Sequence, residues 1–169
     1  IKPIGAGHSF SPIAATGGVL LDLQWLDRVL AVDGMNVTLG AGTNLFQLPA
    51  VLGPFGLALE NMGDIDQQTI AGATSTGTHG TGLAFGGLAT RIRAATLVTA
   101  FGDILRVSST EIPELLPAVS LGIGALGILV DVTIECVPAF SIEAVERKET
   151  LDVVLDEWLE RAAGHDHFE

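Results

Sequence analysis

The sequence is poor in cysteine, in basic residues and in aromatic residues. Its 169 residues include one Cys and no Tyr, and eight Lys plus Arg stand against 20 Asp plus Glu. A lone cysteine excludes an internal disulfide and a zinc site of paired cysteines, so we interpret Cys136, within an apolar run, as a buried thiol. The net charge of −12 argues against a nucleic-acid partner and gives no indication of binding to an anionic membrane.

Long hydrophobic runs and familiar catalytic signatures are also lacking. No apolar run approaches the roughly twenty residues of a membrane-spanning helix. No signal-peptide pattern is present, and we expect a cytoplasmic protein. The sequence contains neither HExxH nor GxSxG, so neither a zinc protease nor a serine hydrolase is predicted. No metal site is predicted.

Short apolar runs separated by Gly and Asp predict a mixed α/β (α+β) fold. The expected strands cover residues 1–4, 19–23, 37–39, 92–99, 104–107 and 127–137, with a hairpin turn at Gly102-Asp103. Expected helices begin at residue 43 or 44 and run to 52, open at 109–114, and cover 151–163, where apolar residues recur at helical spacing.

These elements predict three parts along the chain. Residues 1–90 form a first lobe of mixed α/β structure, and residues 91–138 form a second lobe, mostly an antiparallel sheet with helices. Residues 139–169, with a strand over 141–147 followed by the last helix, are expected to begin a further domain. The sequence starts within a strand and stops after a helix, so we expect it to be an internal piece of a longer polypeptide.

Two glycine-rich segments are the most informative stretches. Residues 4–11 read IGAGHSFS and residues 71–82 read AGATSTGTHGTG. The second has too little apolar surface to build a core. Both offer backbone N–H groups and short hydroxyls, among them those of Ser9 and Thr76, to a flat anionic ligand. Because neither segment contains Lys or Arg, we expect phosphate binding to rely on backbone dipoles.

Two familiar phosphate-binding motifs do not match these segments. Residues 5–10 lack the third glycine of GxGxxG, and the short stretch to the next strand, broken by Pro12, leaves no room for a crossover helix. The second segment has Thr78-His79 where a P-loop carries Lys and Ser or Thr, so NTP chemistry is not expected. A diphosphate attached to a large aromatic ring fits both segments better.

Four parts of the sequence together carry a family resemblance. They are IGAGHSFS at 4–11, VTLGAGT at 37–43, NMGDIDQQTIAG at 61–72 with TGTHGTG at 76–82, and GIGALGIL at 122–129. This combination resembles the FAD-binding domain of the vanillyl-alcohol oxidase superfamily, and within it the sugar-1,4-lactone oxidases (gulonolactone and arabinonolactone oxidase-like) and the alditol oxidases. The resemblance covers residues 1 to about 140 and implies a two-lobed FAD-binding domain of the PCMH type.

The resemblance also implies which residues contact FAD. Residues 3–9 match the segment that wraps the diphosphate, residues 76–82 match the segment that runs on toward the isoalloxazine, and Ile128 matches the position near adenine. His8 occupies the position where many members carry an 8α-histidyl flavin bond, and is the candidate for a covalent link. The expected cofactor-binding residues are Pro3, Ile4, Gly5, Ala6, Gly7, His8, Ser9, Gly72, Thr76, Gly77, Thr78, His79, Gly80, Thr81, Gly82 and Ile128.

The implied activity is that of an FAD-dependent oxidoreductase acting on a CH–OH group of a sugar-1,4-lactone. Hydride passes to flavin N5, and oxygen or another acceptor reoxidises the flavin. Ala73 stands where some alditol oxidases have serine, which favours a lactone over a polyol. The base and the substrate contacts are expected in a C-terminal substrate domain, so no catalytic residue is assigned and this piece alone is expected to be inactive. An alditol or hydroxyacid oxidase on the same scaffold and a cofactor-free structural piece remain as alternatives.

Overall fold

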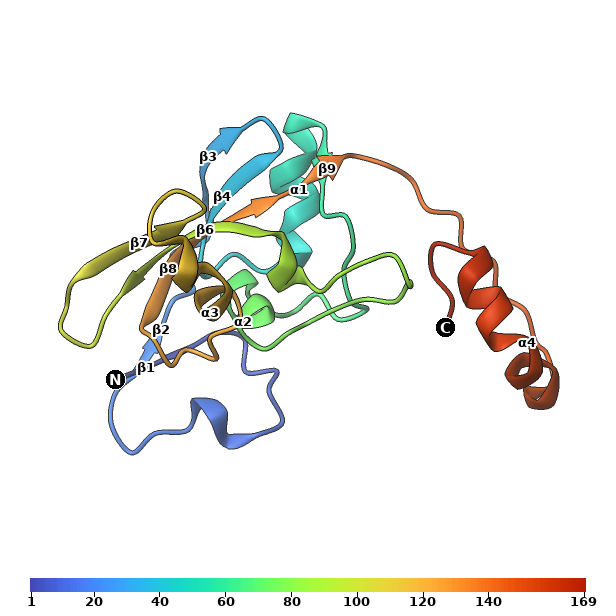
Figure 1. Cartoon of the computed structure of the whole chain (residues 1–169). Helices are drawn as coiled ribbons and strands as arrows, with labels where there is room; N and C mark the ends of the chain where they lie inside the picture. Colours follow the sequence, from blue (N-terminus) through green and yellow to red (C-terminus); the bar gives the residue numbers. More distant parts are fainter.

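A five-stranded antiparallel sheet forms the centre of the computed structural model, which describes residues 1–169 (Figure 1). The central strand is buried because its apolar side chains alternate toward the core: Val132 and Ile134 are 1% and 0% exposed, and pair with Leu39 and Val37. The strand order is β3 (Val29–Asp33), β4 (Asn36–Gly40), β8 (Ile128–Glu135), β6 (Ile92–Val98) and β7 (Ile104–Ser108).

The mixed α/β fold class is confirmed, and so is the hairpin at Gly102-Asp103, which joins β6 to β7. Gly102 adopts a φ of +86°, which favours glycine at this turn. The sheet takes strands from both sides of Thr90, since β3 and β4 precede it and the other strands follow it. The division into lobes at this position stays a prediction. β3 was not predicted, although its residues 29–32 form a short apolar run; it is an edge strand, and its residues are mostly exposed.

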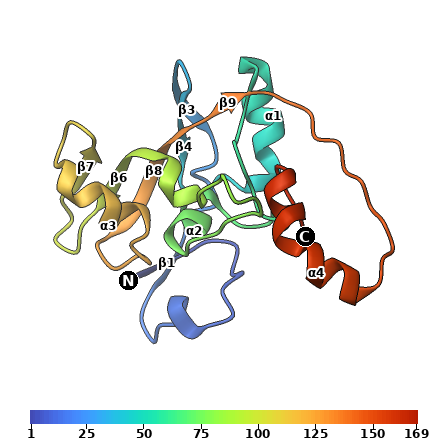
Figure 2. The same cartoon turned by 45° about the vertical axis from the view of Figure 1, so that its right-hand side comes forward.

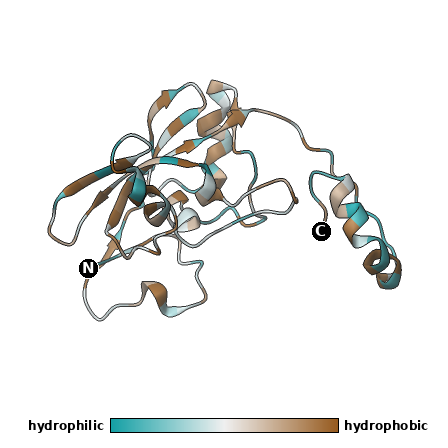
Figure 3. Ribbon diagram, in the orientation of Figure 1, coloured by the Kyte–Doolittle hydropathy of each residue, from teal (hydrophilic) through white to brown (hydrophobic).

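Short helices pack on the sheet and complete the core (Figures 1 and 2). The expected helix after residue 43 is confirmed as two consecutive elements, opened by an Asn44–Gln47 capping box. The expected second helix starts only at Pro113. Figure 3 shows mainly apolar residues along the sheet strands. The helical elements near the core are η2 (Leu45–Gln47), α1 (Leu48–Leu52), η3 (Gly53–Phe55), α2 (Ile70–Ser75), η4 (Leu88–Arg91), η5 (Pro113–Leu115) and α3 (Leu116–Ser120).

The second glycine-rich segment does contribute to the core, contrary to expectation. Its first half is α2, in which Ala71, Ala73, Thr74 and Ser75 are all buried. Each small side chain buries little area, but together they let the helix pack closely against its neighbours. The buried Thr74 hydroxyl is satisfied within the helix, because it donates a hydrogen bond to the Ile70 carbonyl at 2.9 Å.

Two small sheets flank the central one. β1 (Lys2–Ile4) and β2 (Leu20–Asp22) pair in parallel, and β5 (Leu57–Ala58) pairs antiparallel with β9 (Val137–Pro138). The connection from β1 to β2 contains only the short η1 (Pro12–Ala14) and no crossover helix, as the sequence predicts. This loop, residues 5–19, extends away from the central sheet (Figure 1).

The last part of the chain differs from the prediction in one respect. The strand expected over residues 141–147 is wrong: these residues are irregular, pair with no strand and leave Ile142 and Val145 exposed. An extended segment needs a sheet edge for its backbone hydrogen bonds, and this one meets none. The last helix is confirmed as α4 (Leu151–Gly164). None of the helices combines the length and the apolar character needed to cross a bilayer.

The residues after α4 return to the body of the molecule (Figure 2). The His167 ring stacks on Phe85 with 5.0 Å between ring centroids, and its Nδ1 lies 3.1 Å from the Thr81 carbonyl oxygen. The Asp166 carbonyl lies against Gly82. The second half of the glycine-rich segment therefore contacts the C-terminal residues.

The buried thiol of Cys136 is expected to make the free energy of unfolding depend on pH. It lies between β8 and β9 and is 2% exposed, and burial raises the pKa of its thiol to about 11. Between pH 9 and 11 the unfolded chain releases the thiol proton while the folded chain keeps it, so the free energy of unfolding falls as pH rises. The chain has no Tyr and two Lys, so few other side chains titrate there.

We therefore expect the wild-type protein to lose roughly 1–3 kcal/mol more stability from pH 9 to pH 11 than Cys136→Ala loses. Urea unfolding across this pH range measures the difference. Parallel pH profiles for the two proteins would contradict the expectation.

Candidate functional site

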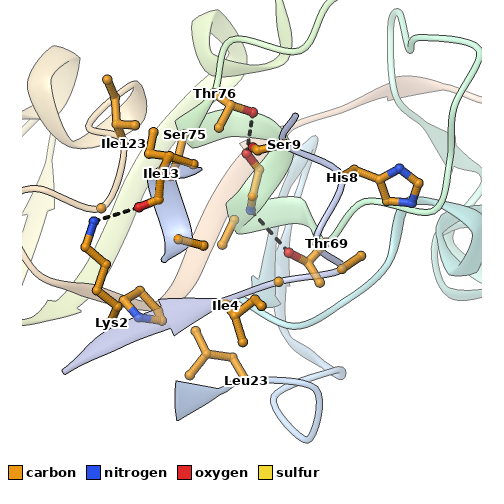
Figure 4. Close-up of a pocket in the computed structure, with 18 of the residues that line it drawn as sticks. Lys2, Ile4, His8, Ser9, Ile13, Leu23, Thr69, Ser75, Thr76 and Ile123 are labelled. Atoms are coloured by element: carbon orange, nitrogen blue, oxygen red, sulfur yellow. Dashed lines mark hydrogen bonds between the residues drawn. The ribbon is translucent and has the colours of Figure 1, made fainter. Parts of the chain in front are cut away.

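The two glycine-rich segments, far apart in the sequence, line one pocket of about 410 Å³ (Figure 4). This volume lies within the roughly 300–1,000 Å³ of pockets that hold small molecules and cofactors. The loop after β1 forms one wall, α2 forms the opposite wall, and the turn before β8, with Ile123 and Gly124, closes one side. A more open hollow continues past His8 and Ser9 to Gly77 and Thr78.

Close backbone packing shapes the pocket where the two segments meet. A Cβ at Gly5 would lie 2.4 Å from Oγ1 of Thr69, the residue that caps α2. That oxygen accepts a hydrogen bond from the Gly72 N–H at 3.2 Å and is not free to move away. Only glycine therefore allows the first loop to approach the second here. Two residues later, Gly7 adopts a φ of +73°, which favours glycine.

The lining of the pocket contains no carboxylate. None of the chain's 20 Asp and Glu residues lines this pocket or the adjoining hollow. The ionisable side chains that do line them are Lys2 and His8. An anionic ligand would therefore meet no like charge at short range in an otherwise strongly acidic protein.

The structure brings most of the predicted cofactor residues together. Gly77 and Thr78 line the adjoining hollow, and Ile128 stands between the lining residues Gly127 and Leu129. The predicted residues that line the pocket itself are Pro3, Ile4, Gly5, Ala6, Gly7, His8, Ser9, Gly72 and Thr76.

Five of the predicted residues, namely Ile128 and residues 79–82, line neither the pocket nor the hollow. At Gly80 a Cβ would lie 2.3 Å from the Met62 carbonyl oxygen, and the Thr81 carbonyl accepts a hydrogen bond from the Asn61 side-chain amide at 2.9 Å. Together with the contacts to His167 described above, these bonds pack residues 79–82 against other loops. Their role toward the cofactor stays a prediction.

Several lining residues were not predicted individually. Lys2 precedes the first glycine-rich segment. Its position on the strand that leads into that segment could have indicated that it lines the pocket. Six others lie outside the segments that carry the family resemblance: Pro12, Ile13, Ala14, Ala15, Leu20 and Leu23. Most of the remaining ones fall within those segments, but nothing in their residue types marks them as lining a pocket. They include Gln68, Thr69, Ile123, Gly124 and Gly127.

His8 differs from the other three histidines. The Nδ1 atoms of His79, His165 and His167 are each within hydrogen-bond distance of a backbone carbonyl oxygen, at 2.9, 2.8 and 3.1 Å. The exposed ring of His8 has no hydrogen-bond partner and lies at the junction of the pocket and the hollow. A ring nitrogen there is free to act as a nucleophile toward a bound ligand.

Comparison with known proteins connects this site to a family. A family model described as FAD binding domain matches residues 1–108, which include both glycine-rich segments. L-gulono-1,4-lactone dehydrogenase of Mycobacterium tuberculosis is 43% identical over 171 residues, an alignment that covers 100% of this chain and 39% of that protein. L-gulonolactone oxidase of Scyliorhinus torazame is 44% identical over 157 residues, covering 92% of this chain and 36% of that protein.

A putative D-arabinono-1,4-lactone oxidase of Neurospora crassa is 38% identical over 160 residues, which cover 94% of this chain and 29% of that protein. The chain thus spans 29–39% of the length of these curated relatives. Among solved structures, the carbohydrate oxidase from Microdochium nivale, in complex with a substrate analogue, matches 82% of this chain and 31% of its own. Its TM-score is 0.74 at 22% identity, which shows a shared fold.

The family match covers more than half of the chain, and FAD is the cofactor that this family's description names. The residues that line the pocket come from the matched range, from the turn before β8 and from the start of β8. The chain therefore belongs to the FAD-binding domain family.

Proposed function

We propose that this chain is the FAD-binding part of an oxidoreductase that oxidises a CH–OH group of a sugar-1,4-lactone. The observation that carries the proposal is the single acid-free pocket in which the two glycine-rich segments meet. The substrate class is supported by the curated relatives, whose names are lactone dehydrogenases and lactone oxidases. Because some of these names are dehydrogenases and others are oxidases, we propose that either oxygen or another acceptor reoxidises the flavin.

The pocket fits a dinucleotide cofactor with a diphosphate. Gly5 has no space for a side chain, residues 5–9 all line the pocket, and Gly5 and Gly7 can line it only with their backbone. Backbone N–H groups in such a loop bind phosphate oxygens without a large desolvation cost. The residues that would hold FAD are therefore those of the first loop with Gly72 and Thr76. Bound FAD supplies the two-electron acceptor for oxidation of a carbinol carbon.

His8 is proposed as the residue that attaches the flavin covalently. Support comes from its exposed ring, which makes no hydrogen bond, and from its position where the pocket opens into the hollow. Residues 76–82 are proposed to extend the site toward the isoalloxazine. No side chain of this chain is assigned as the base that takes the hydroxyl proton, and we propose that this base lies in a substrate domain of the full-length protein.

The absorption spectrum of the full-length protein tests the cofactor. We expect flavin bands in the purified protein, or after addition of FAD and removal of the unbound cofactor by gel filtration. A protein that remains colourless after this treatment would favour the cofactor-free structural piece.

The substrate class is then tested with a panel of sugar-1,4-lactones, alditols and 2-hydroxyacids, assayed for oxygen uptake and for reduction of a dye. Faster turnover of alditols or hydroxyacids than of every lactone would reject the lactone proposal.

A further inference from the structure

One lysine, Lys2, lines the pocket, and it belongs to the first strand. The Lys2 backbone N–H donates to the Val19 carbonyl at 2.9 Å, which fixes the residue at the start of β1. Its side chain reaches along the pocket and donates a hydrogen bond from Nζ to the Ile13 carbonyl at 2.6 Å (Figure 4). An ammonium group carries three N–H donors, so two remain for another acceptor.

Lys2 has no carboxylate partner. The ion pairs of the structure involve Arg91, Arg93 and Arg161, whose charges are compensated by glutamates. Lys2 takes part in none of them, and no acidic residue lines the pocket beside it. In a protein with a net charge of −12, an uncompensated cation in an acid-free pocket marks the place where an anionic group is most favoured.

We propose that Lys2 Nζ binds the diphosphate of the dinucleotide in this pocket, an inference that rests on the proposed function of FAD binding. The hydrogen bond from the same ammonium to the Ile13 carbonyl also has a structural role. It ties η1 to β1, so the charge is held at the loop that forms one wall of the pocket. Phosphate binding at this site then uses a side-chain charge in addition to the backbone N–H groups of residues 5–9.

The test measures ligand affinity in the full-length protein. Every protein compared carries His8→Ala. Without a covalent bond at residue 8, the titrations measure non-covalent affinity alone. Lys2→Gln is compared with the control Lys148→Gln, which removes the same charge from an exposed residue outside the pocket. Three probes are titrated by calorimetry: FAD and ADP, which carry the diphosphate, and riboflavin, which lacks it. Each titration is repeated at low and at high salt.

We expect Lys2→Gln to weaken FAD and ADP binding about tenfold, the effect of one charge-assisted hydrogen bond, and to leave riboflavin binding unchanged. The dependence of ADP binding on salt should become shallower, because screening then acts on one fewer ionic contact. Lys2→Arg, which keeps the charge, should recover most of the ADP affinity. Lys148→Gln should match the parent for all three probes.

Two results would overturn the inference while leaving FAD binding intact. Unchanged FAD and ADP affinity in Lys2→Gln would show that the ammonium makes no contact with the diphosphate. An equal loss for all three probes, with an unaltered salt dependence, would show that Lys2 acts only by holding η1 in place. Failure of both the wild-type protein and the His8→Ala parent to bind FAD would instead reject the proposed function.

Discussion

Replacing His8 by alanine is expected to remove the covalent bond to the flavin, so that acid precipitation of the full-length protein releases the cofactor. After acid precipitation, the yellow colour should remain in the pellet of the wild-type protein and pass entirely to the supernatant of the variant. The expectation follows from the exposed ring of His8, which makes no hydrogen bond and is next to Gly7, whose φ of +73° turns the loop at the pocket. A bond from a ring nitrogen would hold the flavin even after the fold is lost.

His79→Ala is the matched control, because it removes an imidazole from the other glycine-rich segment. The Nδ1 of His79 is 2.9 Å from the Gly80 carbonyl oxygen, and the residue lines neither the pocket nor the hollow. We expect this variant to keep its flavin in the pellet. Free flavin in the supernatant of the unmodified protein would show that FAD is held without a covalent bond, and would leave the FAD pocket itself in place.

Gly42→Ala is expected to destabilise the protein by roughly 3 kcal/mol or more. An added Cβ would lie 2.0 Å from the Leu23 carbonyl oxygen and 2.8 Å from its carbonyl carbon. These are backbone atoms, so no side-chain rotation relieves the clash. Gly42 also donates its N–H to the Leu26 carbonyl at 2.9 Å, a bond that the displaced chain would strain. Urea unfolding measures the loss.

The same substitution should weaken FAD binding, because Leu23 lines the pocket and follows β2, the partner strand of β1. Gly164→Ala serves as control, since a Cβ there meets no atom within 4 Å and the residue ends α4. Its unfolding midpoint should stay within experimental error of the wild type. A Gly42→Ala protein as stable as this control would mean that the 23–26 segment is not packed against residue 42 as the structure shows.

The glycines of the GAG sequence at residues 40–42 illustrate how much the sequence predicts and where it stops. The resemblance identifies the segment, and the alternating residues before it predict a strand, which β4 confirms. The sequence does not say what approaches these glycines. The structure shows the chain at Leu23–Arg28 lying against both of them, with Gly40 donating its N–H to the Arg28 carbonyl at 2.9 Å. Such a contact depends on chain segments that no local pattern relates.

Residues 71–82 show the same limit in a different way. Their small side chains predict close approach, which the structure confirms, but they do not reveal that the first half is a buried helix. The strand expected over 141–147 fails for a related reason: a strand forms only where another strand supplies hydrogen bonds, and these residues pair with none. A residue pattern describes one chain segment at a time, whereas side-chain packing and strand pairing each require two segments.

The sequence by itself determined the fold class, most of the sheet strands and the two glycine-rich segments that identify an FAD-binding domain. It did so because backbone conformation and close approach depend on local residue types, which short segments carry. Only the tertiary structure decided that residues 3–9 share a pocket with Gly72 and Thr76, that residues 79–82 pack elsewhere, and that Lys2 is the cation facing the pocket. Those facts depend on which distant surfaces meet, and that is set by the packing of the whole chain around one core.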